Sequence, residues 1–351
     1  MKISHRYQNR ALIFFPLLIA LLISPSLYAQ NGGFAGASNR IGYSARGMAM
    51  GNAMSAVTTE GAYSYYNPAQ AAMLIDKRQA DFSIGALQFD RIFQSSGVQF
   101  KLPPTAGLSF NLLRTGVQDI DGRTVSGYST GLFDINEYQL SSIFGIRLSN
   151  KMKAGIGLKF NMADYHSELD NAIGVGLDFG ILYHAGIHTN IALSIKDLFA
   201  NYKWNAQDLY GLSQGRDVIN NFPTRYTLGV AYQKNQVTVS ADFEIQSYTS
   251  EIQTTSTFVE DGVPTTITSS EEINTSSTQL RLGSSWRAHQ RFTLRAGWQL
   301  PDTEDFDSWA LSSGFSIHLP FDVFSPSIDY AFVMEPYQIS NMHVFSLRLN
   351  L

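Results

Sequence analysis

Strict alternation of apolar and polar residues is the feature that most constrains this chain. In "KAGIGLKFNM" (153–162), apolar side chains occupy every second position, and lysine, glycine or asparagine fills the positions between them. The stretches 173–183, 224–234, 236–246 and 291–300 repeat the pattern. A period of two is that of a β-strand with one apolar face. The sequence therefore predicts an all-β fold.

Two kinds of β-protein alternate in this way: soluble sandwiches and membrane barrels. The predicted strands run about nine to eleven residues, the length of a tilted membrane-crossing strand, whereas soluble strands average about five or six. A charge that faces lipid at mid-depth costs about 2–4 kcal/mol, so a barrel must keep charges off its outer face. The charges of these stretches do occupy the polar register, at Lys153, Lys159, Asp178, Lys196, Asp242, Glu244, Arg281, Arg295, Asp329 and Arg348. The sequence favours a transmembrane antiparallel β-barrel.

Short and long connections alternate between the strands, as in outer-membrane barrels with short periplasmic turns and longer outer loops. We expect about fourteen strands, an even number that places both chain ends on the periplasmic side. The connection 247–277 is rich in Ser and Thr, and either a long hairpin turning at "DGVP" (261–264) or a disordered tip would fit it. The predicted strands are 80–89, 92–101, 105–113, 138–148, 152–162, 173–183, 190–198, 224–234, 236–246, 278–287, 291–300, 308–319, 326–334 and 343–351.

The composition of the chain excludes several classes of partner and of covalent modification. Charged residues make up 15% of the chain, below the quarter that is usual in soluble proteins. The net charge is −4 without a basic block, which argues against a nucleic-acid partner, and the absence of Cys excludes disulfides and a lipid anchor on Cys. Aromatic residues of the outward register fall near strand ends, as interface girdles or ordinary strand propensity would place them. They are Tyr138, Tyr183, Tyr226, Trp286, Trp298, Trp309 and Tyr330.

The N-terminus has the features of a secretory signal peptide. A basic start, "MKISHRYQNR", precedes an apolar run over 11–23 and the small-residue stretch "SPSLYAQ". The alternative is a membrane anchor, but a spanning helix needs about 20 apolar residues. We therefore predict a signal peptide over 1–29, a separate segment over 30–78 and the barrel over 79–351.

Small residues and methionines dominate the segment that precedes the first strand. Gly and Ala permit close packing, and Met supplies adaptable apolar contacts. Asn67 is a good N-cap and Pro68 suits a first helical position, so we expect a short helix from Pro68 to Leu74. The segment 30–78 is predicted to be a hatch inside the barrel lumen. It would either fill space or gate a ligand path, and the sequence leaves both open.

The stretch "ARGMAMGNAMSAVTTEGAYSYYNPAQAAM" (45–73) resembles the N-terminal signature of the PorV/PorQ group, within the FadL-like fatty-acid-transporter barrels. Family members often continue as "NPAGL", where this chain has "NPAQA". The matching positions are Ala45, Arg46, Gly47, Met48, Met50, Gly51, Glu60, Tyr66, Asn67, Pro68 and Ala69. Of these, Arg46, Gly47, Met48, Gly51, Asn67, Pro68 and Ala69 form the predicted hatch motif.

This resemblance implies a fourteen-stranded barrel with an N-terminal hatch in the bacterial outer membrane. It also implies a role in type IX protein secretion or surface attachment, with secretion-system proteins or exported cargo docking on the outer loops. The alternative is a FadL-like channel that takes up hydrophobic small molecules such as long-chain fatty acids. Such a channel needs an apolar pocket behind the hatch.

The last strand, "HVFSLRLNL" (343–351), resembles the signal that outer-membrane barrels present to their insertion machinery. Phe345, Leu347, Leu349 and Leu351 share its apolar face. Such signals usually end in an aromatic residue, whereas this one ends in Leu351.

The search for catalytic motifs gives a negative result. "GYSTG" (127–131) fits the G-x-S-x-G pattern but falls in a predicted outer loop and not at a strand-to-helix turn. The sequence predicts no catalytic, cofactor-binding or metal site, and we expect a protein that is not an enzyme. Acidic residues of the loops are expected to be solvated, because they lack the spacing of a calcium loop. They are Asp119, Asp121, Asp302, Glu304, Asp305 and Asp307.

Overall fold

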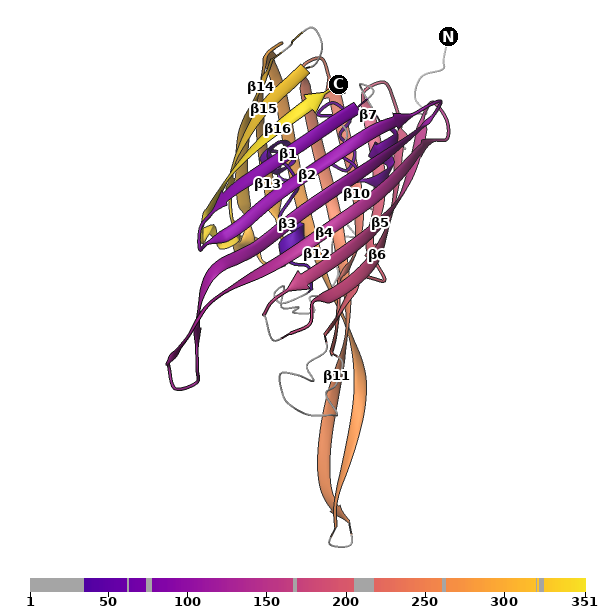
Figure 1. Ribbon diagram of the computed structural model, residues 1–351. Helices are drawn as coiled ribbons and strands as arrows, with labels where there is room; N and C mark the ends of the chain where they lie inside the picture. Colours follow the sequence, from indigo (N-terminus) through magenta and orange to yellow (C-terminus); the bar gives the residue numbers. More distant parts are fainter. Residues whose placement is uncertain are drawn as a thin grey trace. The chain divides into compact units, whose positions relative to one another are not determined.

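The computed structural model describes residues 35–61, 63–73, 78–166, 169–204, 218–260, 263–319, 321 and 325–351, and of residues 218, 250–260 and 263–271 the backbone alone. Fourteen antiparallel strands close into one barrel (Figure 1). The barrel strands are β1 (Arg78–Leu87), β2 (Arg91–Leu102), β3 (Ala106–Arg123), β4 (Ser129–Arg147), β5 (Met152–Asp164), β6 (Ala172–His184), β7 (Thr189–Leu198), β10 (Thr224–Lys234), β11 (Val237–Glu260), β12 (Val263–His289), β13 (Phe292–Leu300), β14 (Ala310–His318), β15 (Ser325–Met334) and β16 (Asn341–Asn350).

Each strand pairs with its neighbours in the chain, and the first strand pairs with the last to close the ring. In that closing pair, Phe82 of β1 lies opposite Leu347 of β16. A separate two-stranded sheet joins β8 (Asn201–Trp204) to β9 (Val218–Asn221) between β7 and β10. The predicted fold class is confirmed, and every one of the fourteen predicted stretches coincides with a barrel strand.

Two connections expected to be loops are largely strand. The predicted loop 114–137 is wrong in this respect, because β3 and β4 continue to pair beyond the barrel, with Ile120 opposite Phe133. Of the two alternatives for 247–277, the hairpin is confirmed, and β11 and β12 remain paired as far as Glu260 and Val263. Residues 261–262 of the "DGVP" turn lie outside the described residues. Backbone groups in each hairpin satisfy one another across the pair, so the strands persist without an apolar face. Both hairpins project from the same end of the barrel, which we call the loop end; the end that carries the short turns is the turn end (Figure 1).

The alternation of side chains sorts them between the two faces of the barrel wall. Along β6 the exposed fraction alternates between low and high at successive positions. The charges predicted for the polar register point inward: Lys159, Asp178 and Arg348 are at most 2% exposed, and Lys153 is half-buried. Apolar residues such as Leu158 and Leu228 are about half exposed on the outer face.

The lumen is occupied by the segment that precedes β1. We call its described residues, 35–61 and 63–73, the hatch. Its helices are η1 (Ser38–Arg40), α2 (Ala45–Ala49) and η2 (Pro68–Ala72), and most of its residues are buried (Figure 1). Two further 3-10 turns, η3 (Phe306–Ser308) and η4 (Pro336–Gln338), lie in connections at the loop end.

Among the described residues, no helix has the length and apolar character needed to cross a membrane.

Candidate functional site in the barrel lumen

The hatch contacts the barrel wall on two opposite sides. The helix α2 packs on β13, β14, β15 and β16, whereas η2 packs on β2, β3, β4, β5 and β6. Strands β14 and β5 are separated by seven steps around the ring of fourteen, so they face each other across the lumen. The hatch therefore spans the lumen and is held at both ends.

Ion pairs hold the first side. Arg46 of α2 is 5% exposed, and its Nε lies 3.0 Å from both carboxylate oxygens of Asp329 on β15. Its Nη1 donates to the backbone oxygen of Glu60, 2.9 Å away. The Glu60 carboxylate in turn accepts from Nε of Arg295 on β13 at 2.9 Å. Losing one partner of a buried pair leaves an uncompensated charge and costs about 3–5 kcal/mol, so these contacts fix the position of the hatch strongly.

A further pair extends this network to the strands that close the barrel. Nε of Arg348 on β16 donates to Asp81 on β1 at 2.7 Å, and its Nη1 donates to the backbone oxygen of Glu60. The Arg348 guanidinium also lies over the ring of Tyr63, 4.2 Å from its centroid. One turn of the hatch, at Glu60, thus gathers three arginines from α2, β13 and β16.

A second group of charges lies among β5, β6, β7 and β10. Nζ of Lys159 lies 2.8 Å from Asp178 and 2.7 Å from Asp197, and Asp197 also pairs with Arg225 at 2.6 Å. Nζ of Lys196 donates to the backbone oxygen of Tyr65 in the hatch at 2.9 Å. Buried charges require such partners, because desolvation of an isolated ion is costly.

The Asn-Pro-Ala motif forms the opposite contact. The Asn67 side chain accepts from the N–H of Ala69, and Pro68 occupies the first turn of η2, as predicted. The helix is a 3-10 helix that ends at Ala72. The Asn67 amide also donates to the backbone oxygens of Ser55 and Ile181, both at 3.1 Å. The Asn67 side chain therefore caps η2, links η2 to the hatch backbone at Ser55 and hydrogen-bonds to β6.

Gln70 is a key residue of the hatch that sequence reasoning missed. It is 0% exposed, its Nε2 donates to the Met54 oxygen at 2.7 Å, and its Oε1 accepts from the Tyr63 N–H at 2.9 Å. The sequence marked it only as the departure in "NPAQA". In the structure, the Gln70 side chain links the turn at Met54 to the turn at Tyr63.

Beneath η2, the wall carries four glycines on adjacent strands. They lie directly opposite one another in register: Gly107, Gly145, Gly155 and Gly180, which we call the glycine row. A Cβ at Gly155 would lie 2.3 Å from the backbone carbon of Pro68, and one at Gly107 would lie 1.9 Å from the Ala71 oxygen. Real Cβ atoms are never this close, so only glycine lets η2 rest on the wall. The sequence showed these glycines in the polar register without revealing that they align.

The other predicted motif residues lie where α2 meets the wall. Gly51 has φ of +59°, and a Cβ there would lie 2.9 Å from the Trp298 oxygen. Gly47 abuts the Tyr66 ring, and Met48 is 1% exposed within the apolar cluster described next. The structure thus brings Arg46, Gly47, Met48 and Gly51 together at one side of the lumen, and Asn67, Pro68 and Ala69 at the other.

An apolar cluster fills the lumen beside the closing strands. The hatch contributes Tyr43, Tyr63, Tyr65, Tyr66, Met48, Met50 and Met54. The wall contributes inward-facing exceptions to the polar register: Phe93, Leu113, Leu182, Val333, Met342 and Val344, together with Ala192, Ala231 and Ala331. Tyr43 and Tyr65 stack with centroids 5.0 Å apart. We call the wall residues of this cluster the apolar sector.

The predicted C-terminal targeting residues lie on the outer face. Phe345, Leu347 and Leu351 are 50%, 41% and 53% exposed, and Leu349 shares their register on β16. Recognition of this face by insertion machinery stays a prediction.

The structure also places the catalytic pattern and a loop acid noted in the sequence. Ser129 of "GYSTG" is exposed where β4 begins, in the β3–β4 hairpin. No group of three or more Asp, Glu or His side chains able to hold a metal occurs among the described residues. Arg123 pairs with the loop acid Asp121 at 2.6 Å.

Comparison with known proteins identifies the class of fold. No family model matches the chain, and no curated protein matches it in sequence. Among solved structures, the toluene transporter TbuX of Ralstonia pickettii matches with a TM-score of 0.60 and 14% identity over 89% of this chain and 98% of its own. The toluene transporter TodX of Pseudomonas putida gives 0.58 and 14% over 88% and 96%. A FadL homologue of Pseudomonas aeruginosa gives 0.55 and 11% over 88% and 97%.

The chain therefore shares the fold of these solved structures, a closed fourteen-stranded barrel. At these identities the likeness concerns the fold alone. The expected placement in the PorV/PorQ group finds no support among these matches.

Proposed function

We propose that this protein is a bacterial outer-membrane channel for hydrophobic small molecules. The observation that carries the proposal is the apolar cluster: aromatic and methionine side chains of the hatch meet the apolar sector inside a lumen whose wall also carries many buried charges. The fold supports it, since the matched structures are described as transporters of toluene and as a FadL homologue. In this arrangement the loop end faces outward, and residues 1–29, which lie outside the described residues, direct export.

The charges of the lumen argue against a route for ions or polar solutes. The arginines and lysines discussed above are engaged by carboxylates or backbone oxygens of the wall and hatch, so they are not available to attract a passing ion. An apolar molecule finds compatible surface along the apolar cluster, and a second buried cluster of the described residues adds Tyr202, Trp204 and Phe222. Passage there requires the hatch to shift, which gives the hatch the gating role that the sequence left open.

The secretion role predicted from the PorV/PorQ resemblance receives no support from the matched structures. Secretion-system proteins or cargo would have to dock at the loop end, where the β3–β4 and β11–β12 hairpins project. The experiment below separates this role from transport.

A reversible lock on the hatch tests the proposal. A Cβ at Gly229 on β10 would lie 3.2 Å from the Cβ of Ser55 in the hatch, slightly below the roughly 3.5–4.5 Å of a disulfide, and 2.4 Å from Oδ1 of Asp242, whose side chain must move aside. The natural chain has no Cys, so Ser55→Cys with Gly229→Cys gives a single defined bridge. In proteoliposomes, we expect the oxidised double variant to block entry of radiolabelled toluene or oleate and the reductant to restore it.

The single variant Ser55→Cys is the matched control and should conduct under both conditions. Equal uptake by the locked and reduced protein would show that the hatch is only a plug. If uptake is absent from the wild type while deletion of the gene impairs surface attachment of secreted proteins, the secretion role replaces the channel.

A further inference from the structure

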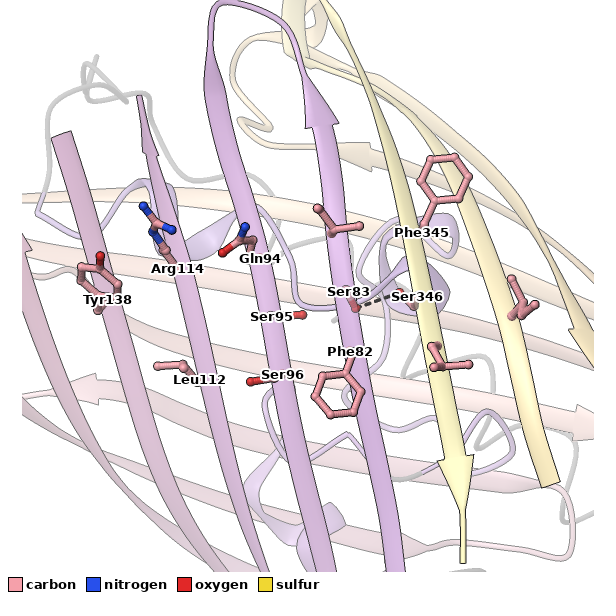
Figure 2. A pocket seen from close by; sticks show the side chains of 13 residues that line it. Phe82, Ser83, Gln94, Ser95, Ser96, Leu112, Arg114, Tyr138, Phe345 and Ser346 are labelled. Carbon is pink, nitrogen blue, oxygen red and sulfur yellow. Dashed lines mark hydrogen bonds between the residues drawn. The ribbon is translucent and has the colours of Figure 1, made fainter. Parts of the chain in front are cut away.

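The outer face of the barrel carries a groove over the closing strands. Its apolar walls come from β15, β16, β1 and β3: Phe82, Ile84, Leu112, Ile328, Phe345 and Leu347. It is open along its outer side and has a volume of about 730 Å³, within the range of about 300–1,000 Å³ typical of ligand pockets. Figure 2 shows it from close by.

The groove exists because one outward position carries a small side chain. Ser96 of β2 lies directly between Phe82 of β1 and Leu112 of β3 in the sheet register. Large apolar residues occupy this register on both neighbours, so the serine leaves a hollow between them (Figure 2). An aromatic or branched residue at this position would close it.

The Arg114 guanidinium places a positive charge at the end of the groove. Arg114 of β3 belongs to the next row of the register, beside Gln94 of β2 and Tyr138 of β4 (Figure 2). Its Nε and Nη2 donate to Oδ1 of Asn136 at 3.2 and 2.9 Å, and its guanidinium lies 5.7 Å from the centre of the Tyr138 ring. The side chain is thus held in place, but no carboxylate of the described residues forms an ion pair with it.

The position of the row that contains Gln94 and Arg114 determines how deep the Arg114 side chain lies in the membrane. Ile84 and Gln94 lie three positions from the loop-end limits of β1 and β2, Leu87 and Arg91. Tyr138 lies midway along β4, beside Arg114 and close to where β3 and β4 continue beyond the barrel, and aromatic residues are enriched at the membrane interface. Because the proposed function places the loop end outside, Arg114 lies at the headgroup level of the outer leaflet and the groove runs from it into the hydrocarbon.

We propose that the groove binds one anionic, acylated lipid of the outer leaflet, with its phosphate on Arg114 and an acyl chain over Ser96. Charge complementarity selects the occupant, because a guanidinium that lacks a protein counter-ion pairs well with phosphate through its planar array of donors. The proposal rests on the membrane orientation above. It does not depend on what the lumen transports.

Native mass spectrometry tests the lipid site. The full barrel is purified in detergent and mixed with equimolar dioleoyl phosphatidylglycerol and dioleoyl phosphatidylcholine, which share acyl chains and differ in charge. We expect the wild type to retain the anionic lipid with a preference of about fivefold, the contribution typical of one arginine at an anionic surface. Arg114→Gln should abolish this preference, whereas Arg123→Gln, on the projecting β3–β4 hairpin, should keep it.

A second pair of variants tests the groove itself. Ser96→Phe fills the hollow and should reduce retention of both lipids, whereas Ser284→Phe, at an outward position of β12 that is remote from the groove, should not. Heat-modifiable migration of each variant verifies folding, and if Arg114→Gln fails to fold, the serine pair decides. Lack of preference in the wild type, preference retained by Arg114→Gln, or equal retention by the two serine variants would overturn the proposal. So would retention of an uncharged hydrocarbon that Arg114→Gln leaves unchanged.

Discussion

Arg46 of the hatch and Asp329 of β15 form a buried ion pair, with the guanidinium Nε 3.0 Å from each carboxylate oxygen. These residues are 283 positions apart in the sequence. The pair therefore connects the segment before the first strand to the next-to-last strand. Its strength follows from burial, since water screens neither partner.

Arg46→Met is expected to lower the free energy of unfolding by about 3–5 kcal/mol, because Asp329 then remains buried without its partner. Urea unfolding in detergent, followed by Trp fluorescence, measures the effect. Arg123→Met is the matched control: it breaks an ion pair with Asp121 whose side chains are 59% and 48% exposed, and it should cost about 0–1 kcal/mol. Equal losses in the two variants would contradict this interpretation of the hatch.

Gly155→Ala should displace η2 from the wall, because the new Cβ meets the backbone of Pro68 at 2.3 Å. Overpacking of this kind typically costs about 1–3 kcal/mol. Gly157→Ala, on the same strand, is the control: its nearest contact is a side-chain carbon of Ile143 at 3.2 Å, which can yield. Limited proteolysis of the hatch should be faster in the first variant than in the second. A hatch equally protected in both would show that the glycine row does not seat η2.

Gln70→Met should destabilise the hatch while nearly preserving side-chain volume. It leaves the Tyr63 N–H buried without its acceptor, which costs about 1–3 kcal/mol. The Met54 oxygen loses one of its two donors and keeps the Val57 N–H at 3.3 Å. Amide hydrogen exchange over residues 45–73 should become faster than in the wild type. Unchanged exchange would mean that water replaces the amide and that Gln70 is dispensable.

A pH-dependent contact joins the first residue of β2 to the β15–β16 connection at the loop end. Glu335 accepts from Arg91 at 2.7 and 2.8 Å, and Ser340 also donates to it. Burial raises the pKa of Glu335, but the hydrogen bonds from Arg91 and Ser340 outweigh that effect and hold the pKa below its ordinary value. A lowered folded-state pKa means that the contact stabilises the protein above the unfolded pKa, about 4.3, and is lost as pH falls through the folded value.

Glu335→Gln should therefore lower stability at neutral pH and flatten its dependence on pH below about 4.3. The difference in unfolding midpoint between variant and wild type, measured from pH 7 to pH 3, checks this. The two proteins should converge at the acid end. A constant difference across the range would assign the loss to packing and not to ionisation.

Alternation was sufficient to predict the wall, because a spanning strand must present apolar groups to one side at every second residue. It could not predict which inward residues meet. Gly107 and Gly180 lie 73 positions apart, and their alignment depends on the stagger of four strands, which a single sequence does not fix. The helix at Pro68 was predictable because capping is local chemistry. Gln70 was not, because its partners lie at Met54 and Tyr63.

The length of the β3–β4 hairpin was underestimated for a related reason. The search for strands relied on an apolar face, and β3 and β4 continue past Val117 and Ile135 where that face ends. Pairing between the two strands sustains them there. The groove beside Ser96 was equally hidden, since it depends on which side chains flank that serine across two neighbouring strands.

Contacts of the hatch with both β5 and β14 make it a strut across the diameter of the barrel. Because the hatch contacts both sides of the wall, a force that deforms the barrel also acts on the hatch. Lateral pressure that flattens the wall must compress the hatch, and any movement that frees the hatch must leave the ring more compliant. For the channel proposed above, opening of the lumen and softening of the wall would then be one event, and the thickness and tension of the surrounding bilayer would act on both.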